Sequence, residues 1–148
     1  MRKKLTNIET EAWVGLVKSQ QLLLDKVEAE LKRHGLPPLS WYDVLLELDL
    51  KSAGKLRFNE IRKRVLLRKY NVTRLLYRLE GKGFVRRETC SEDGRGIYAV
   101  ITKKGRDLRR RMWPVYREVV RKHFLSHFNA NEINQLAEFL RRVRNLNQ

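Results

Sequence analysis

The stretch from Val72 to Arg106 changes its hydrophobic period partway along, and this change constrains the fold more than any other feature of the sequence. Its first part repeats three leucines at helical spacing among basic residues: Leu75, Leu76 and Leu79. Gly81 and Gly83 end this pattern, and two short β-type runs follow around the glycine-rich turn at 92–96. The order predicts a helix followed by a β-hairpin, which is the core of a winged helix.

The basic charge of the chain is concentrated in the same region. The chain has 33 Lys and Arg against 17 Asp and Glu, which gives a formal net charge of +16. Between residues 55 and 87, 12 basic side chains face only Glu60 and Glu80, a local balance of +10. A clustered positive surface attracts polyanions, and a helix beside a hairpin fits the major and minor grooves of duplex DNA. Nucleic acid is therefore the predicted partner, against the alternative of a uniformly basic solvated surface.

Composition excludes several other classes of protein. No run of about 18 apolar residues is present to span a membrane, and no apolar run follows the charged amino terminus, so a soluble, cytoplasmic protein is expected. The single cysteine, Cys90, allows no intrachain disulfide and fits a reducing compartment. The sequence has no nucleophile elbow, P-loop, dinucleotide fingerprint or zinc-protease motif, so neither an enzyme nor a cofactor is predicted. His123 and His127 lie four residues apart, but too few further ligands stand nearby to predict a metal site.

Six helices are predicted from apolar spacing and turn residues, over 7–33, from 40 to the turn at 52–54, about 57–65, about 69–82, from 103 to about 124, and from Asn129 or Asn131 towards the end. Gly35 and the Pro37-Pro38 pair should stop the first. Ser40 and Asp43 resemble a capping box at the start of the second. In the fifth, Pro114 predicts either a kink or a junction of two helical pieces.

The long terminal helices carry more apolar surface than a small winged lobe can cover. Their stripes include Ile8, Trp13 and Leu16 at one end and Ile133, Leu136 and Leu140 at the other. A second copy of the chain would cover both, because a twofold pairing buries the same faces on each subunit. The sequence therefore predicts a homodimer, which matches a pseudo-palindromic DNA site.

Three segments together resemble the MarR family of bacterial regulators, which are dimeric winged-helix DNA-binding proteins. They are Val72 to Arg87, the wing Asp93-Gly94-Arg95, and Ile101 to Gly105. The resemblance covers nearly the whole chain and implies a mainly α fold with a small β-wing, a winged helix-turn-helix. It further implies a single MarR-like domain over 1–148. The dimerisation helices would span about 5–34 and 103–147, and the winged-helix DNA-binding lobe about 40–102.

The resemblance also implies how such a protein acts. The helix around Arg68 to Lys82 would enter the major groove of double-stranded DNA, and Arg95 would reach the minor groove. The expected function is sequence-specific transcriptional regulation, as a repressor whose DNA affinity changes with a small-molecule effector. The alternative is a basic architectural or RNA-binding protein, which would use the same charge without reading a sequence.

Candidate DNA-binding residues gather on the predicted recognition helix and the wing: Arg68, Lys69, Asn71, Thr73, Arg74, Arg78 and Arg95. Arg74 and Arg78 lie four apart, on a face away from the leucines, where an arginine can grip guanine or clamp a phosphate. Tyr70 suits either a contact or packing. The family usually has small hydroxyl or acidic residues where Arg68 to Asn71 stand here, so the DNA site is expected to differ. Peroxide-sensing members carry their cysteine near the start of the first long helix, which Cys90 does not match.

Five aromatic residues come from segments that the family fold brings together, and they are candidates for an effector pocket: Trp13, Trp41, Tyr42, Trp113 and Tyr116. Ligand sites are mostly apolar with a few polar anchors, so such a pocket would suit a small aromatic or carboxylate-bearing compound. The alternative is an ordinary aromatic core, because nothing in the spacing specifies a ligand.

Overall fold

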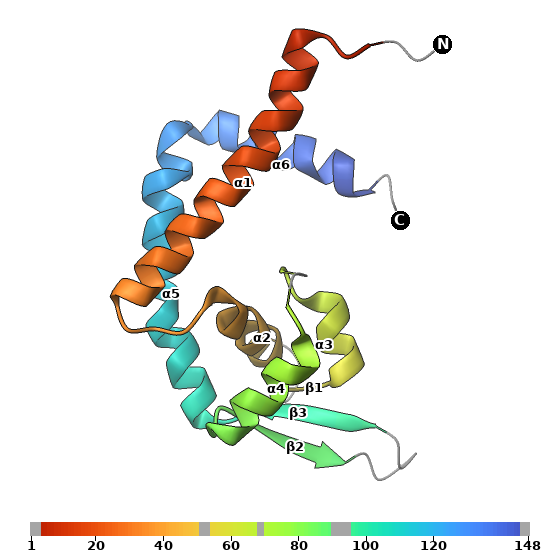
Figure 1. Cartoon of the computed structure of the whole chain (residues 1–148), viewed down its shortest axis with the longest axis vertical. Coiled ribbons are helices and arrows are strands. Elements are labelled where there is room, and N and C mark those ends of the chain that lie inside the picture. The colour runs from red at the N-terminus through yellow and green to blue at the C-terminus, as the bar shows by residue number, and fades with distance from the viewer. Residues whose placement is uncertain (1–3, 51–53, 68–69, 90–95, 146–148) are drawn as a thin grey trace. The chain divides into compact units, whose positions relative to one another are not determined.

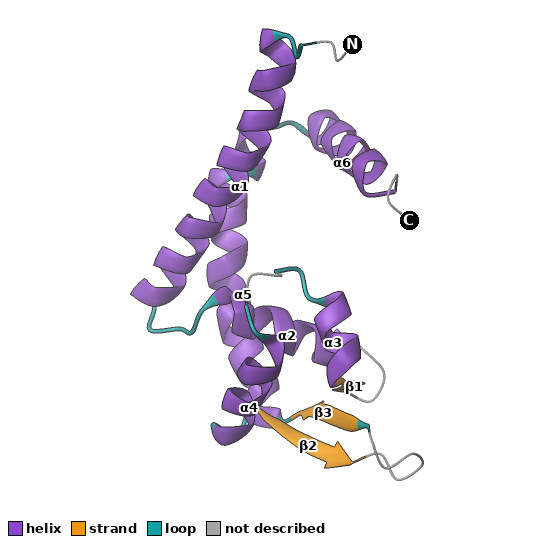
Figure 2. Cartoon of the chain, turned by 45° about the vertical axis from the view of Figure 1, so that its right-hand side comes forward, coloured by secondary structure: helices purple, strands orange, loops and turns teal. Residues whose placement is uncertain are grey.

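A computed structural model of the chain describes residues 4–50, 54–67, 70–89 and 96–145. In these ranges helices predominate and the strands form one small sheet (Figures 1 and 2). The elements follow in the order α1 (Asn7–Arg33), α2 (Leu39–Leu50), β1 (Lys55–Arg57), α3 (Phe58–Arg64), α4 (Val72–Gly81), β2 (Val85–Thr89), β3 (Ile97–Ile101), α5 (Lys103–His123), the 3-10 turn η2 (Leu125–His127) and α6 (Ala130–Asn145). This confirms the predicted mainly α fold with a small β-wing.

The chain divides into two compact units. Leu31–Val115 forms one, here called the winged lobe, and Met1–Glu30 together with Tyr116–Gln148 forms the other, here called the terminal unit. The helices α1 and α5 each contribute residues to both units. The assignment of the terminal helices to dimerisation stays a prediction.

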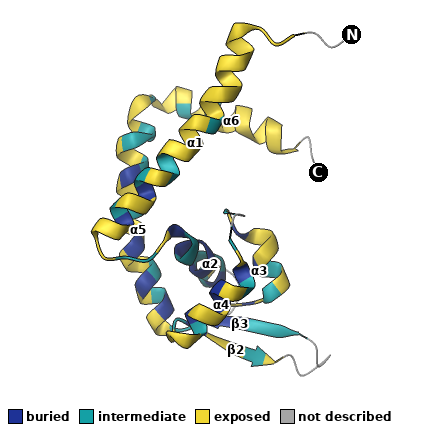
Figure 3. Ribbon diagram, viewed as in Figure 1, coloured by how far each residue is buried: buried dark blue, intermediate teal, exposed yellow. Residues whose placement is uncertain are grey.

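The winged lobe has a well-buried apolar core built around α2 and α4. The largest side chains with almost no exposed surface come from five helices that contribute to the lobe: Leu31 from α1, Val44, Leu45 and Leu48 from α2, Ile61 from α3, Leu76 and Leu79 from α4, and Met112 from α5. Figure 3 shows these buried stretches in dark blue. Full burial of one such side chain stabilises a fold by about 1.5–3 kcal/mol, so this core fixes how the short helices pack.

The sheet is antiparallel with the order β1-β3-β2. In β2 and β3, Val85 pairs with Ile101 and Thr89 with Ile97, which is the hairpin predicted for the wing. The third strand, β1, was not predicted from the sequence. It has three residues, of which only Leu56 is buried, and so short a run has no measurable hydrophobic period.

Two helices of the lobe end in the same glycine-dependent turn. After α1, Gly35 has a φ of +69°, and the Leu36 N–H donates to the Leu31 carbonyl at 2.9 Å. After α4, Gly83 has a φ of +82°, and the Phe84 N–H donates to the Leu79 carbonyl at 2.9 Å. A left-handed glycine that closes these bonds is the Schellman motif, so the predicted stops are confirmed.

The start of α5 is bonded to the chain that leaves α4. Thr102 Oγ1 accepts from the Gly105 N–H at 3.1 Å, as expected of a capping residue, and donates to the Gly83 carbonyl at 2.7 Å. A Cβ on Gly105 would lie only 2.2 Å from the Phe84 carbonyl oxygen. Glycine is therefore required at this position by the close approach of two backbones.

Of two helix caps predicted from the sequence, one is present in the structure and one is not. Asn129 and Glu132 exchange side-chain and backbone bonds of 2.9 and 3.0 Å, so Asn129 rather than Asn131 caps α6. The capping box predicted for Ser40 and Asp43 is wrong, because the Asp43 carboxylate is bonded to a distant turn instead. Pro114 lies inside α5, which runs through it as one helix.

The terminal unit leaves much of its apolar surface exposed. Among its described residues no side chain of α6 is buried, and Phe139 and Val143 are 53% and 59% exposed. On α1, Ile8 and Trp13 are 70% and 62% exposed. Within the described ranges, no helix is both long enough and apolar enough to cross a membrane.

Candidate nucleic-acid interface

The helix α4 presents one buried and one exposed face. Asn71 Oδ1 accepts from the Arg74 N–H at 3.0 Å and caps the helix, which therefore starts three residues later than predicted. Leu75, Leu76 and Leu79 are buried, whereas Arg74 and Arg78 lie exposed on the opposite face. The leucine spacing thus determines which arginines face solvent.

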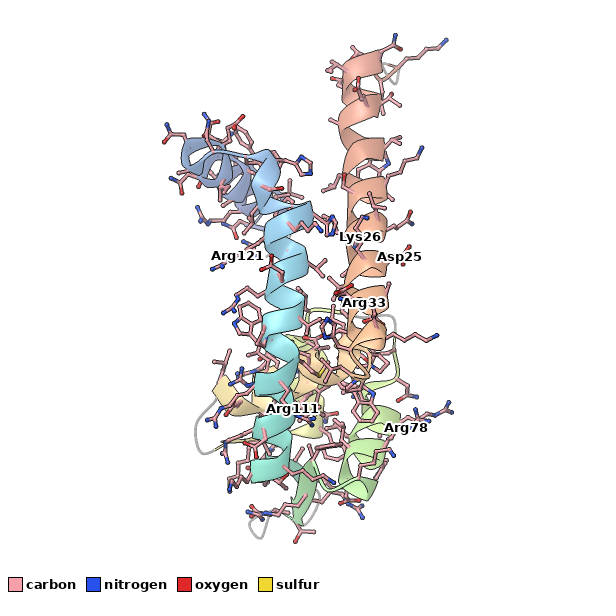
Figure 4. All side chains as sticks on the ribbon, turned by 90° about the vertical axis from the view of Figure 1, so that its left-hand side faces the viewer. Asp25, Lys26, Arg33, Arg78, Arg111 and Arg121 are labelled. Atoms are coloured by element: carbon pink, nitrogen blue, oxygen red, sulfur yellow. The ribbon has the colours of Figure 1, made fainter. Side chains whose placement is uncertain are left out.

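Arg74 and Arg78 are available to a ligand. Among the residues that the structure describes, neither guanidinium has a carboxylate partner, and Figure 4 shows Arg78 extending away from α4. Side chains four residues apart lie one above the other along a helix. Thr73 is half-buried one position before Arg74, and Asn71 uses its side-chain oxygen for the cap. The pair of arginines is therefore the most accessible part of the predicted set.

A hollow of about 500 Å³ adjoins this face between α3, α4 and the start of β3. It is lined by residues of these elements and by Arg57 at the end of β1: Arg57, Phe58, Asn59, Arg62, Thr73, Tyr77, Gly96 and Ile97. A second hollow of about 520 Å³ lies between the end of α3 and the start of α4, and shares Arg62 and Thr73. Backbone phosphates are contacted by basic and hydroxyl side chains of this kind.

Arg57 and Arg62 were not among the residues predicted for DNA binding. Arg62 donates to the Asn59 side chain at 2.7 Å, and Arg57 donates to the Tyr98 hydroxyl at 3.3 Å. Both belong to the basic cluster over residues 55–87, which was the only sequence signal for them. Their place beside α4 depends on how α3 and β3 pack, which spacing does not show.

An ion pair joins α4 to the hairpin. Arg87 on β2 donates to Glu80 at 2.6 Å, and its guanidinium lies 5.1 Å from the centre of the Tyr77 ring. Glu80 raises the pKa of the exposed Arg87, because the bond favours the charged form. Phe58 packs edge-on against Tyr77 at 5.9 Å. Arg87 therefore joins the hairpin to α4, and Phe58 joins α3 to α4.

The turn between α3 and α4 is bonded to α2. Asp43 accepts the Leu66 and Leu67 backbone N–H groups, each at 2.8 Å, and the Tyr70 hydroxyl at 3.3 Å. Burial, with a contribution from Asp43, raises the pKa of Tyr70, so its hydroxyl remains a proton donor. Tyr70 is therefore engaged within the lobe, which was one of its two predicted roles.

Several residues singled out in the sequence lie outside the described residues: Arg68, Lys69, Cys90 and the wing residues Asp93, Gly94 and Arg95. DNA contact by Arg68, Lys69 and Arg95 stays a prediction. Within the described ranges, no three His, Cys, Asp or Glu side chains gather as metal ligands would.

The aromatic candidates for an effector pocket divide into different environments. Tyr42 is buried and stacks on Trp113, with ring centres 6.0 Å apart and planes inclined by 14°. Trp41 instead packs edge-on against Phe84 at 6.0 Å. These four rings belong to the winged lobe, whereas two candidates, Trp13 and Tyr116, belong to the terminal unit. Within the lobe, the structure brings together only Tyr42 and Trp113 among the described candidate rings.

Known proteins share both the sequence pattern and the arrangement of elements. The sequence model of the MarR family matches residues 34–96. YkoM of Bacillus subtilis, an uncharacterized HTH-type transcriptional regulator, is 32% identical over 112 residues, which cover 76% of this chain and 70% of YkoM. The homoprotocatechuate degradative operon repressor of Escherichia coli is 25% identical over 127 residues, which cover 86% of this chain and 83% of the repressor.

A solved structure extends the likeness to the whole fold. Sco3205 of Streptomyces coelicolor, a MarR family transcriptional regulator in complex with DNA, superposes with a TM-score of 0.85 at 30% identity. The match covers 97% of this chain and 90% of Sco3205. Two of these proteins are named as transcriptional regulators and one as an operon repressor, which agrees with the prediction of a non-enzyme. The family match, the identity to YkoM and the shared fold show that this chain belongs to the MarR family of transcriptional regulators.

Proposed function

We propose that the protein is a homodimeric repressor that binds a pseudo-palindromic DNA duplex by sequence. The observation that carries this proposal is the exposed face of α4, where Arg74 and Arg78 stand without carboxylate partners among the described residues. The hollow beside that face adds Arg57 and Arg62. The relative Sco3205 was solved in complex with DNA, which supports the same use of the lobe here.

In this proposal each contact has a separate task. Arg74 reads a base edge or clamps a phosphate in the major groove, since an arginine can bond guanine at two atoms. Arg57 and Arg62 contact the backbone, which positions the lobe without carrying sequence information. Arg95, outside the described residues, would reach the minor groove. Two lobes must lie about 34–36 Å apart to meet successive major grooves on one face of the duplex.

Dimerisation is proposed from the apolar surface of the terminal unit. Phe139, Leu140 and Val143 on α6 and Ile8 and Trp13 on α1 are exposed in the single chain. Exposed apolar area of this extent is characteristic of an interaction surface, and a second copy offers the same surface in return. Repression is proposed because the Escherichia coli relative is named as an operon repressor.

The test is selection of duplexes from a random pool by the purified protein, followed by binding measurements at one salt concentration. A selected duplex should bind at least about a thousandfold more tightly than its scrambled version, as is usual for specific regulators. A scrambled duplex and an RNA hairpin of equal charge serve as controls. Equal affinity for all three would favour the architectural or RNA-binding alternative and contradict sequence reading.

We also propose that a small aromatic or carboxylate-bearing effector weakens DNA binding. The support is the stacked pair Tyr42 and Trp113 within the winged lobe. A ligand can lower DNA affinity only by binding better to the state that binds DNA less well. Benzoate and phenol are suitable probes, because they present the two chemistries separately.

The effector proposal predicts two linked responses. A probe that binds should raise the melting temperature and weaken binding to the selected duplex together. Trp113→Ala should abolish both responses, whereas Phe128→Leu, which alters a ring pair outside the candidate set, should leave them. No thermal response to either probe or to a wider aromatic series, with DNA binding unchanged, would favour the ordinary aromatic core.

A further inference from the structure

Asp43 is a buried carboxylate in a strongly basic chain. Its residue is only 6% exposed, although the chain carries a net charge of +16. Within the described residues no Lys or Arg side chain pairs with it. It is satisfied instead by two backbone N–H groups and one hydroxyl. A carboxylate that is buried without a cation needs several good hydrogen bonds. Asp43 therefore depends on the backbone and hydroxyl groups that surround it.

The bonded amides lie where the chain turns between the two helices of the helix-turn-helix. Val65 closes α3, with its N–H donating to the Ile61 carbonyl at 3.1 Å, and Asn71 caps α4. Leu66 and Leu67 therefore lie in the turn, between the two helices. Both of their N–H groups point at one carboxylate, one at each oxygen. Two bonds to adjacent amides fix the direction of the turn as well as its position.

The carboxylate is itself held rigidly. Its neighbours on α2, Val44 and Leu45, are fully buried, and Tyr42 stacks on Trp113. On the far side of the turn, Tyr70 donates its hydroxyl to the same oxygen that accepts from Leu67. Asp43 thus joins the core helix to both ends of the segment that leads into α4.

We propose that Asp43 is a positioning residue for sequence reading: it holds the turn so that α4 meets the major groove in one pose. The inference rests on the proposed function, because a pose matters only if α4 reads bases. Base contacts require a fixed direction of the helix, whereas attraction to phosphates depends mainly on charge. Loss of Asp43 should therefore reduce sequence preference far more than general affinity for DNA.

The test compares Asp43→Asn with Asp49→Asn in the full-length protein. An asparagine has the same shape but only one acceptor oxygen, so it loses one of the two amide bonds. Asp49 lies on the same helix and accepts from Arg106 and Arg109 on α5 at 3.2 and 2.5 Å. It has the same charge and lies on the same helix as Asp43, but among the described residues its carboxylate is bonded to α5 and not to the turn. The measured quantity is the ratio of affinities for the selected and scrambled duplexes.

Asp43→Asn should lower this ratio about tenfold or more, with the affinity for the scrambled duplex changed by less than about twofold. Asp49→Asn should lower the melting temperature but leave the ratio as in the wild type. As a direct readout, amide hydrogen exchange at Leu66 and Leu67 should accelerate in Asp43→Asn and not in Asp49→Asn. If Asp43→Asn does not fold, Tyr70→Phe replaces it, with an expected fall in the ratio of about threefold for one lost bond.

Three outcomes would overturn the inference. One is an unchanged ratio in folded Asp43→Asn, or in Tyr70→Phe where that variant replaces it. Another is an equal fall in the ratio in Asp49→Asn, which would assign the effect to general loosening of α2. The last is a wild-type protein without sequence preference, which also overturns the proposed function. Wild-type preference that survives in Asp43→Asn overturns the positioning role alone.

Discussion

The winged lobe and the terminal unit differ in how far their apolar side chains are buried. Of the described hydrophobic side chains that are buried, all but Val27 and Val119 belong to the lobe. In the terminal unit, Leu16, Phe139 and Val143 have about half or more of their surface in solvent. The lobe therefore completes an apolar core within one chain, whereas the terminal unit leaves apolar side chains exposed in one chain. This contrast is the basis for proposing that the lobe reads DNA and that the terminal unit pairs two chains.

The largest effect is expected from the core of the lobe. Leu79→Ala removes a side chain with no exposed surface, and such substitutions cost about 2–5 kcal/mol of unfolding free energy. Denaturant unfolding followed by tryptophan fluorescence would measure the change. Leu140→Ala, at a position of the terminal unit that is 37% exposed, is the control. It should leave the unfolding free energy of the lobe nearly unchanged. Equal costs would break the contrast between the two units.

A smaller but still large effect is expected on association. Replacing both Phe139 and Leu140 by Glu places charge on the exposed face of α6, so the dimer dissociation constant should rise about a hundredfold or more. Sedimentation over a range of concentrations would measure it. The same pair of substitutions should leave the lobe folded, which unchanged amide hydrogen exchange in its strands would show. A double variant that stays a dimer would show that the apolar face of α6 is not the contact.

A moderate effect is expected at the exposed face of α4 that is proposed to bind DNA. Arg74→Ala should cost about 1–3 kcal/mol of binding free energy and relax preference at particular positions if the side chain reads a base. Titration of the selected duplex and of its single-position variants would measure both effects. Arg111→Ala removes an equal charge from the exposed side of α5 and serves as the control (Figure 4). A loss spread evenly over all duplexes would make Arg74 a phosphate clamp.

The smallest effect is expected at a surface ion pair of the lobe. The bond from Arg86, with help from Lys55, lowers the pKa of the exposed Glu88 carboxyl below its ordinary value of 4.5. A lowered folded-state pKa contributes stability above the unfolded value, and this contribution is lost as the pH falls through the folded pKa. Carbon-detected NMR titration of Glu88 would measure the shift, and Arg86→Ala should reduce it. A pKa at or above 4.5 in the wild type would contradict the pairing.

Long periodic elements of this fold could be predicted from the sequence. The bounds of α1 and the glycine stop at Gly35 follow from a sustained helical period and one left-handed residue. The start of α4 could not be predicted, because the residues before it are also acceptable in a helix. The Asn71 cap sets the first residue of the helix. The strand β1 was missed because its three residues are held by pairing with β3 rather than by a pattern of their own.

In the candidate site, too, features set by local spacing could be predicted, whereas features set by packing between elements could not. The outward direction of Arg74 and Arg78 follows from the leucines on the other face of α4, so local spacing was enough. Arg62 was missed because its relation to α4 is set by packing between separate elements. Asp43 was placed at a helix cap because its true partners lie 23 and 24 residues further along the chain. Contacts at that separation leave no signature in a single sequence.

The close approach of Gly105 to the Phe84 carbonyl has a consequence for anyone who grafts this lobe onto other helices. Because no Cβ fits between them, the first turn of α5 is inseparable from the segment that leaves α4. Asp49 extends this attachment along α5 through Arg106 and Arg109. A chimeric protein should therefore keep the native chain through Arg109, and the splice to a foreign helix belongs beyond that residue.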